Sequence, residues 1–109
     1  MTIIYTAVFL KHIKALAKKY PSIGEDLEAF GESLLDDPQQ GESLGKSWYK
    51  VRFAISSKKT GKRNDSRIIT FVKIEHDTIH LVAAFEKGRR YISDALFFYL
   101  NPYKKEKFV

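Results

Sequence analysis

The sequence contains no cysteine, and this absence excludes several kinds of chemistry at once. Without thiols the chain forms no disulfide bond, offers no thiolate nucleophile and cannot bind zinc through cysteine. The lack of cysteine fits a reducing compartment, so we expect a cytoplasmic protein. No apolar run approaches the ~20 residues that a membrane-spanning helix needs. The apolar start, TIIYTAVFL, has no preceding basic region and no small-residue cleavage site, which predicts a strand and a helix rather than a signal peptide.

Proline and glycine are also scarce, with three and six copies among 109 residues. Hydrophobic residues make up 44% of the whole chain and aromatic residues 14%, which is typical of an ordered globular protein. A chain of this length buries enough surface for one core. Residues 1–109 are therefore predicted to form a single domain.

Charge of one sign is missing from long stretches of the chain. Residues 1–20 hold four lysines and no acid, whereas residues 21–45 hold seven acids and no base. Residues 46–74 hold nine basic residues and a single acid, Asp65. This segregation predicts two surfaces of opposite character, one of which suits a polyanion such as RNA or DNA. The alternative is that the lysines are ordinary solvated surface residues.

The first half of the chain reads as one strand and two helices. A short strand is predicted at Ile3–Tyr5, and Thr6 is placed to cap a helix that ends before Pro21. Ser22 and Glu25 have the spacing of a capping box, which predicts the start of a second helix. Because the link between the helices is short, we expect a helical hairpin.

In the second half the apolar period changes to two. Tyr49, Val51, Phe53 and Ile55 alternate with polar residues, which predicts a strand with these four side chains toward the helices. Further strands are expected at Ser66–Ile74 and Ile79–Phe85, and a short last helix around Ile92–Leu100. The order β-α-α-β-β-β-α indicates an α+β fold, with an N-terminal strand, a helical hairpin packed on an antiparallel sheet, and a short C-terminal helix.

The predicted hairpin carries an excess of basic side chains. Alternation places Trp48, Lys50 and Arg52 on the side of the sheet away from the helices, with Trp48 interpreted as a packing residue. A sheet surface that carries lysine and arginine beside aromatic rings is a platform for RNA. Periodicity does not fix the strand register, so it leaves open whether Arg67 shares this face.

These residues also carry a resemblance. The segments GESLGKSWYKVRFAISSKKTGKRNDSRIITFV and IHLVAAFEKGRRYIS resemble the RelE/ParE toxin superfamily, especially its RelE- and HigB-like branch. That branch shows a similar order of glycine, YK-hydrophobic-R, GK and R-hydrophobic-I-T. The likeness extends from Ile3 to about Ala95. The chain departs from the pattern at Asn64–Asp65, where relatives often have two glycines, and at Phe85, where they carry tyrosine.

The resemblance implies the toxin of a toxin–antitoxin pair that cleaves mRNA, in well-known relatives on the ribosome, without a metal or cofactor. It implies a cognate antitoxin, mRNA and the ribosome as partners, and no membrane. The catalytic residues carried over by position are Lys50, Arg52, Arg67, Lys87 and Tyr91. Further RNA contacts are expected from the remaining basic residues of the two segments: Lys58, Lys59, Lys62, Arg63, Arg89 and Arg90.

The chemistry needs few protein groups, because the 2′-OH of RNA can attack its own phosphate. Arg52 and Arg67 are expected to stabilise the charged phosphate in the transition state. Lys50 is expected to transfer a proton or bind phosphate, and Lys87 to contact the leaving group or the phosphate.

Other interpretations stay open. A ParE-like inhibitor of DNA gyrase would share the fold without nuclease activity, and a non-catalytic RNA-binding relative would keep the basic sheet alone. A histidine-based ribonuclease site is disfavoured, because His12, His76 and His80 fall on a helix, a turn and a strand without motif spacing.

Overall fold

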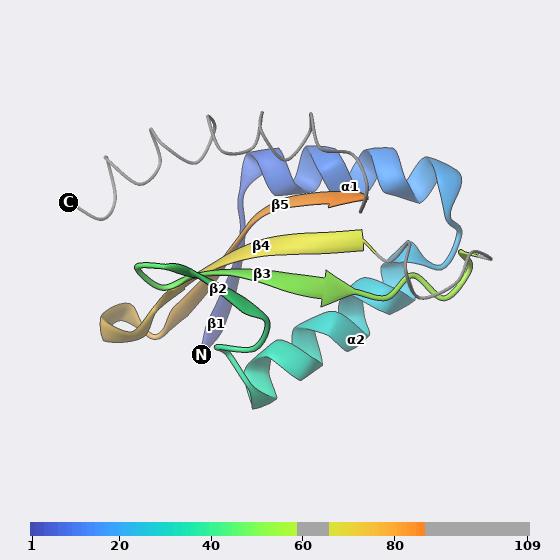
Figure 1. Cartoon of the computed structure of the whole chain (residues 1–109). Coiled ribbons are helices and arrows are strands. Elements are labelled where there is room, and N and C mark those ends of the chain that lie inside the picture. Colours follow the sequence, from blue (N-terminus) through green and yellow to red (C-terminus); the bar gives the residue numbers. More distant parts are fainter. Residues whose placement is uncertain (59–65, 87–109) are drawn as a thin grey trace.

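The computed structural model describes residues 1–58 and 66–86 of the chain. Within these ranges, two helices and five strands fold as an α+β unit (Figure 1). The elements in chain order are β1 (Thr2–Tyr5), α1 (Ala7–Lys19), α2 (Ile23–Asp36), β2 (Glu42–Gly45), β3 (Trp48–Phe53), β4 (Ser66–Lys73), a 3₁₀ turn (Ile74–His76) and β5 (Thr78–Glu86). The helix predicted around Ile92–Leu100 lies outside the described residues.

The sheet has the strand order β1-β5-β4-β3-β2. Its neighbours are antiparallel except for β1, which pairs in parallel with β5. The sheet is therefore mixed, and the prediction of an antiparallel sheet is wrong in this respect. Alternation identifies which residues are extended, but the direction of pairing depends on contacts between distant segments. Here the Thr6 hydroxyl lies 2.9 Å from the Leu81 carbonyl and donates to it, which ties the end of β1 to β5.

Strand β2 was not predicted, because its sequence ESLG is short and has no apolar alternation. Gly41 brings the chain into this strand with a φ of +97°, a conformation that favours glycine. A Cβ atom at this position would stand 2.6 Å from the Lys50 carbonyl oxygen, so only glycine lets the two backbones approach. The close approach places Glu42 opposite Lys50 in the β2–β3 pairing.

The sequence predicted the capping contact of α1 correctly but not that of α2. Thr6 caps α1 as expected, since its side chain accepts a hydrogen bond from the Phe9 N–H at 3.2 Å. The capping box at Ser22 and Glu25 is wrong, because Ser22 makes no side-chain cap to α2. Its hydroxyl instead donates to the carboxylate of Asp26 at 2.6 Å. Ser22 therefore serves a contact beside the helix start rather than the cap itself.

Both helices pack on one face of the sheet, α1 over β5 and α2 near β3, and they diverge from the link between them (Figure 1). The rings of Phe30 and Phe53 meet edge to face with centroids 5.5 Å apart, which seats α2 on β3. The alternation predicted for β3 is confirmed. Val51, Phe53 and Ile55 are buried in the core beneath the helices, and Tyr49 packs against that core.

A second apolar cluster lies on the other face of the sheet, which we call the outer face. Trp48 is buried there with only 1% of its surface exposed, and its ring packs 5.1 Å from that of Phe71. The other members of the cluster are Ile69, Val82, Ala83 and Phe85. Trp48 thus packs within the protein, as its sequence context suggested, and does not offer a ring for base stacking.

Candidate functional site

The register of β3 and β4 brings two arginines together. Arg52 pairs directly with Arg67. Side chains in directly opposed positions of an antiparallel pair share a face, with Cβ atoms ~5 Å apart. Arg67 has the same parity on β4 as Ile69 and Phe71 of the outer cluster, so both arginines belong to the outer face. The open question of register is thereby answered: Arg67 and Arg52 lie side by side.

The two guanidinium groups differ in their surroundings. Arg52 is exposed, whereas Arg67 is half-buried and its Nη1 donates a hydrogen bond to the Ser66 carbonyl at 3.1 Å. The planar donors of arginine match the oxygens of a phosphate, so two guanidinium groups side by side on one face are suited chemically to bind one.

Lys50 completes a basic row on this face. It lies two residues before Arg52 on β3, and alternation puts both on the same side of the sheet. Its Nζ forms an ion pair with Glu42 of β2, with Nζ and Oε2 3.3 Å apart. The side chains are 38% and 64% exposed, so water screens the pair and its contribution is below about 1 kcal/mol. A phosphate could thus compete with Glu42 for the Lys50 ammonium group.

A cleft of about 290 Å³ opens beside Arg52, between α2 and β3. Strand β2 pairs with β3 only as far as Lys50, so β3 has no β2 partner at Arg52 and beyond. The cleft is lined by a carboxylate, a guanidinium and side-chain hydroxyl and amide groups, together with two rings: Asp26, Ser33, Gln40, Arg52, Phe30 and Phe53. Arg52 therefore stands between this cleft and Arg67.

Lys58, one of the expected RNA contacts, forms an ion pair with Glu86. Its ammonium group lies 3.2 Å from Glu86, and its side chain is only 10% exposed. Glu86 also accepts hydrogen bonds from the Lys19 ammonium at 2.6 Å and from the Tyr20 hydroxyl at 2.9 Å. We call these four residues the Glu86 cluster. It joins the end of α1, the segment after β3 and the end of β5.

The protonation of the Glu86 cluster follows from these contacts. Burial opposes ionisation of Glu86, but hydrogen bonds from Lys19, Tyr20 and Lys58 outweigh it and hold the pKa of Glu86 at about 2. Burial and the hydrogen bond to Glu86 raise the pKa of the Tyr20 phenol above its usual value of 10.0. Glu86 is thus ionised and Tyr20 protonated at neutral pH. The cluster is a fixed structural contact rather than a proton-transfer group.

A second carboxylate, that of Asp26, fixes the same segment to α2. Its two oxygens accept hydrogen bonds from the Ser56 hydroxyl at 2.9 Å and from the Ser22 hydroxyl at 2.6 Å. The Ser22 and Ser57 hydroxyls lie 2.7 Å apart. These contacts, like the Glu86 cluster, were missed in the sequence. Glu86 is a lone acid at the end of an apolar segment, and Asp26 lies beside Glu25 in the first turn of α2. Neither position indicates a partner in the sequence.

The histidines do not assemble a ribonuclease pair. His12 faces β5 from α1, where its Nδ1 accepts the Ala84 N–H at 3.1 Å. His80 lies on the outer face beside Phe71, with ring centroids 6.0 Å apart, and His76 is exposed in the 3₁₀ turn. His12 and His80 are therefore separated by the sheet. Among the described residues, no group of three or more histidine, aspartate or glutamate side chains could hold a metal ion.

The remaining predicted site residues lie outside residues 1–58 and 66–86. They are Lys59, Lys62, Arg63, Lys87, Tyr91, Arg89 and Arg90. Within those ranges the structure brings together Lys50, Arg52 and Arg67 and sets Lys58 apart in the Glu86 cluster. No helix in the described part of the chain is long and apolar enough to cross a membrane.

Comparison with known proteins identifies no family. No family model matches the sequence, and a search of curated proteins returns no match. Function must therefore be argued from the geometry of the basic row and from the resemblance of the sequence segments.

Proposed function

We propose that this protein is a RelE/HigB-like toxin that cleaves mRNA. The observation that carries the proposal is the direct pairing of Arg52 with Arg67, with Lys50 on the same face of β3. These are three of the positions that the resemblance marks as catalytic. Each comes from a strand rather than from a loop, so the scaffold holds the backbone of each residue in place.

The reaction fits a site made of cations alone. The substrate supplies its own nucleophile, the 2′-OH, which loses its proton as its oxygen bonds to the adjacent phosphorus. The bond from phosphorus to the 5′-oxygen breaks, and that oxygen takes up a proton. The products are a 2′,3′-cyclic phosphate and a 5′-hydroxyl. In this scheme Arg52 and Arg67 bind the non-bridging oxygens, where negative charge builds in the transition state. Lys50 binds the phosphate or takes part in proton transfer to the leaving oxygen.

A toxin of this kind requires restraint. We propose a cognate antitoxin with an acidic or amphipathic segment that binds the basic surface, and the cytoplasm as the site of action. Association should be fast and sensitive to salt, because opposite charges steer the encounter. The product of a neighbouring reading frame that neither binds nor neutralises this chain would argue against the pairing.

The decisive experiment is to map mRNA ends after induced expression of the chain without an antitoxin. We expect arrested translation and new ends with 5′-hydroxyl groups inside coding regions. A purified translation reaction to which the purified chain is added should give the same ends. The control is the Arg52→Gln/Arg67→Gln double variant, which should leave mRNA intact. Intact mRNA together with inhibited DNA supercoiling by the unmodified chain would instead identify a gyrase inhibitor.

A further inference from the structure

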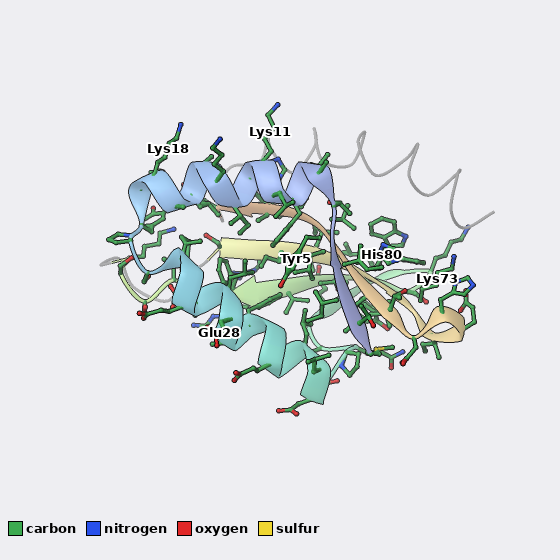
Figure 2. All side chains as sticks on the ribbon, turned by 180° about the vertical axis from the view of Figure 1, so that it is seen from behind. Tyr5, Lys11, Lys18, Glu28, Lys73 and His80 are labelled. Carbon is green, nitrogen blue, oxygen red and sulfur yellow. The ribbon has the colours of Figure 1, made fainter. Side chains whose placement is uncertain are left out.

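The two helices that cover the sheet carry exposed charges of opposite sign. On α1, Lys11, Lys14 and Lys18 are all exposed. Their spacing of three and four residues places them in one stripe along the helix. Figure 2 shows Lys11 and Lys18 projecting from the side of α1 that faces away from α2. We call these three residues the α1 lysine stripe.

The stripe is not used within the described part of the protein. None of its ammonium groups makes an ion pair or a hydrogen bond to residues 1–58 or 66–86. Lys19, one position further, lies 2.6 Å from Glu86. Lys19 therefore stabilises the fold through an ion pair, whereas the three lysines of the stripe present their charge to solvent.

The dimensions of the stripe fit a nucleic-acid backbone. A helix rises 1.5 Å per residue, so Lys11 and Lys18 lie about 10 Å apart along the axis. A duplex carries roughly one phosphate per 1.7 Å of its length, so this span faces several phosphates. A straight row of single-sign charge matches a partner whose charge is regular and of one sign.

Two other classes of partner fit less well. A membrane-binding helix must insert its apolar side, but Phe9 and Leu16 of α1 are 0% and 6% exposed because they pack in the core. A protein surface mixes both signs of charge, whereas the stripe contains only one. The acidic residues of α2 also matter, because Glu25, Glu28 and Glu32 repeat the same spacing on the neighbouring helix. They repel a polyanion and so confine it to α1.

We propose that Lys11, Lys14 and Lys18 form a second RNA-docking surface, which binds the phosphate backbone of double-helical RNA. It lies on the helix side of the sheet, whereas Arg52 and Arg67 lie on the outer face. Its biological use rests on the proposed function: the stripe holds a folded RNA while the outer face acts on a single strand. The protein then needs two RNA segments at once, which favours a large RNA assembly over free mRNA.

The test measures binding of the purified full chain to a 20-base-pair duplex RNA with 2′-O-methyl groups, which cannot be cleaved. The variant is Lys11→Gln/Lys14→Gln/Lys18→Gln, and the matched control is Glu25→Gln/Glu28→Gln/Glu32→Gln on α2. Loss of three phosphate contacts should weaken binding roughly 100-fold at 0.15 M salt and make the log–log salt slope shallower by about 2–3. The α2 control should bind as tightly as the unmodified chain or more tightly. Circular dichroism should show the same helix content in all three proteins.

An unchanged affinity and salt slope in the α1 variant would overturn the inference. So would loss of self-association by the α1 variant without loss of RNA binding, because the partner would then be the acidic α2 of a second copy. Neither result bears on cleavage, which is read from mRNA ends and from the Arg52→Gln/Arg67→Gln variant. Conversely, duplex binding through α1 by a chain that cleaves no mRNA would support the inference and refute the proposed function.

Discussion

Lys58 and Arg67 carry the same charge within one segment of the chain, yet the sheet gives them different settings. Lys58 lies on the helix side, where it shares the carboxylate of Glu86 with Lys19. Arg67 lies on the outer face, directly opposite another cation, Arg52. An ion pair with a partly buried carboxylate contributes to the fold, whereas two arginines side by side present planar donors that suit a phosphate. The strand register, which a count of charges does not give, therefore places the two cations in different settings.

The largest expected effect is on the cleavage rate, and it comes from removing Arg67 on the outer face. Arg67→Ala should lower the rate of mRNA cleavage by about 10²–10³-fold, because a fixed guanidinium no longer meets the charge of the transition state. Arg67→Lys should recover only part of the rate, since lysine keeps the charge but not the planar donors. The measurement is single-turnover cleavage of an mRNA in a purified translation system.

Lys73 offers a matched control for this change. It is a half-buried basic residue on the same strand and, by alternation, on the same face, at the opposite end of β4. Lys73→Ala should leave the cleavage rate unchanged. If Arg67→Ala retained full activity with a native circular dichroism spectrum, the site would not lie at the arginine pair.

The second effect is on stability, and it comes from removing the charge of Glu86, the ion-pair partner of Lys58. Glu86→Gln removes the charge that neutralises Lys58, whose side chain is 10% exposed, so the variant should lose about 2–3 kcal/mol of stability. Urea denaturation at pH 7 measures this loss. Glu42→Gln is the control, because it breaks an ion pair with Lys50 whose members are 38% and 64% exposed. That change should cost less than about 1 kcal/mol.

The same cluster predicts a dependence of stability on acid. Glu86 has a folded-state pKa of about 2, below its ordinary value of 4.5. A depressed carboxylate pKa adds stability that is fully present above the ordinary value and is lost as pH falls toward the folded value. We therefore expect stability to decline between pH 4.5 and about 2, and the Glu86→Gln variant to decline less. Equal acid sensitivity in both proteins would mean that other carboxylates dominate.

Local patterns in the sequence predicted the elements that depend on neighbours in the chain. The alternation of Tyr49, Val51 and Phe53 predicted their side of the sheet, and Thr6 was identified as a cap because its partner is three residues away. The parallel pairing of β1 with β5 was missed, since strand direction depends on segments more than 70 positions apart. A short polar strand such as β2 gives no periodic signal at all.

In the candidate site, too, local sequence order predicted some features, and others depended on distant segments. Basic residues at Lys50, Arg52 and Arg67 were recognised from their order, but only the register showed that two of them are opposed. The ion pair of Lys58 was not predicted, because its partner Glu86 is 28 positions away and carries no motif. Charge content can be counted from a sequence, whereas the neutralisation of a particular charge is a property of the fold.

A smaller effect concerns a buried hydroxyl on the helix side of the sheet. Thr70 is fully buried, and its hydroxyl has no hydrogen-bond partner among the described residues. A buried hydroxyl without a partner costs free energy, and valine has nearly the same shape. Thr70→Val should therefore stabilise the protein by about 1 kcal/mol, seen as a higher urea midpoint with an unchanged slope. A lower midpoint would show that this hydroxyl finds a partner in solution, such as a bound water.

The smallest effect concerns His12, whose side chain on α1 contacts β5. Its Nδ1 accepts the Ala84 N–H at 3.1 Å, a bond that requires an unprotonated nitrogen. Burial, and then the nearby charge of Lys11, lower the pKa of His12 below its ordinary value of 6.5. A histidine with a lowered pKa contributes stability that is present above pH 6.5 and declines as pH falls below it, because the unfolded chain takes up the proton first. Denaturation midpoints measured from pH 7.5 to 5.5 should therefore fall more in the unmodified chain than in His12→Gln, whose side-chain oxygen can accept the same N–H without titrating. Parallel declines would show that His12 takes up a proton without losing its contact to β5.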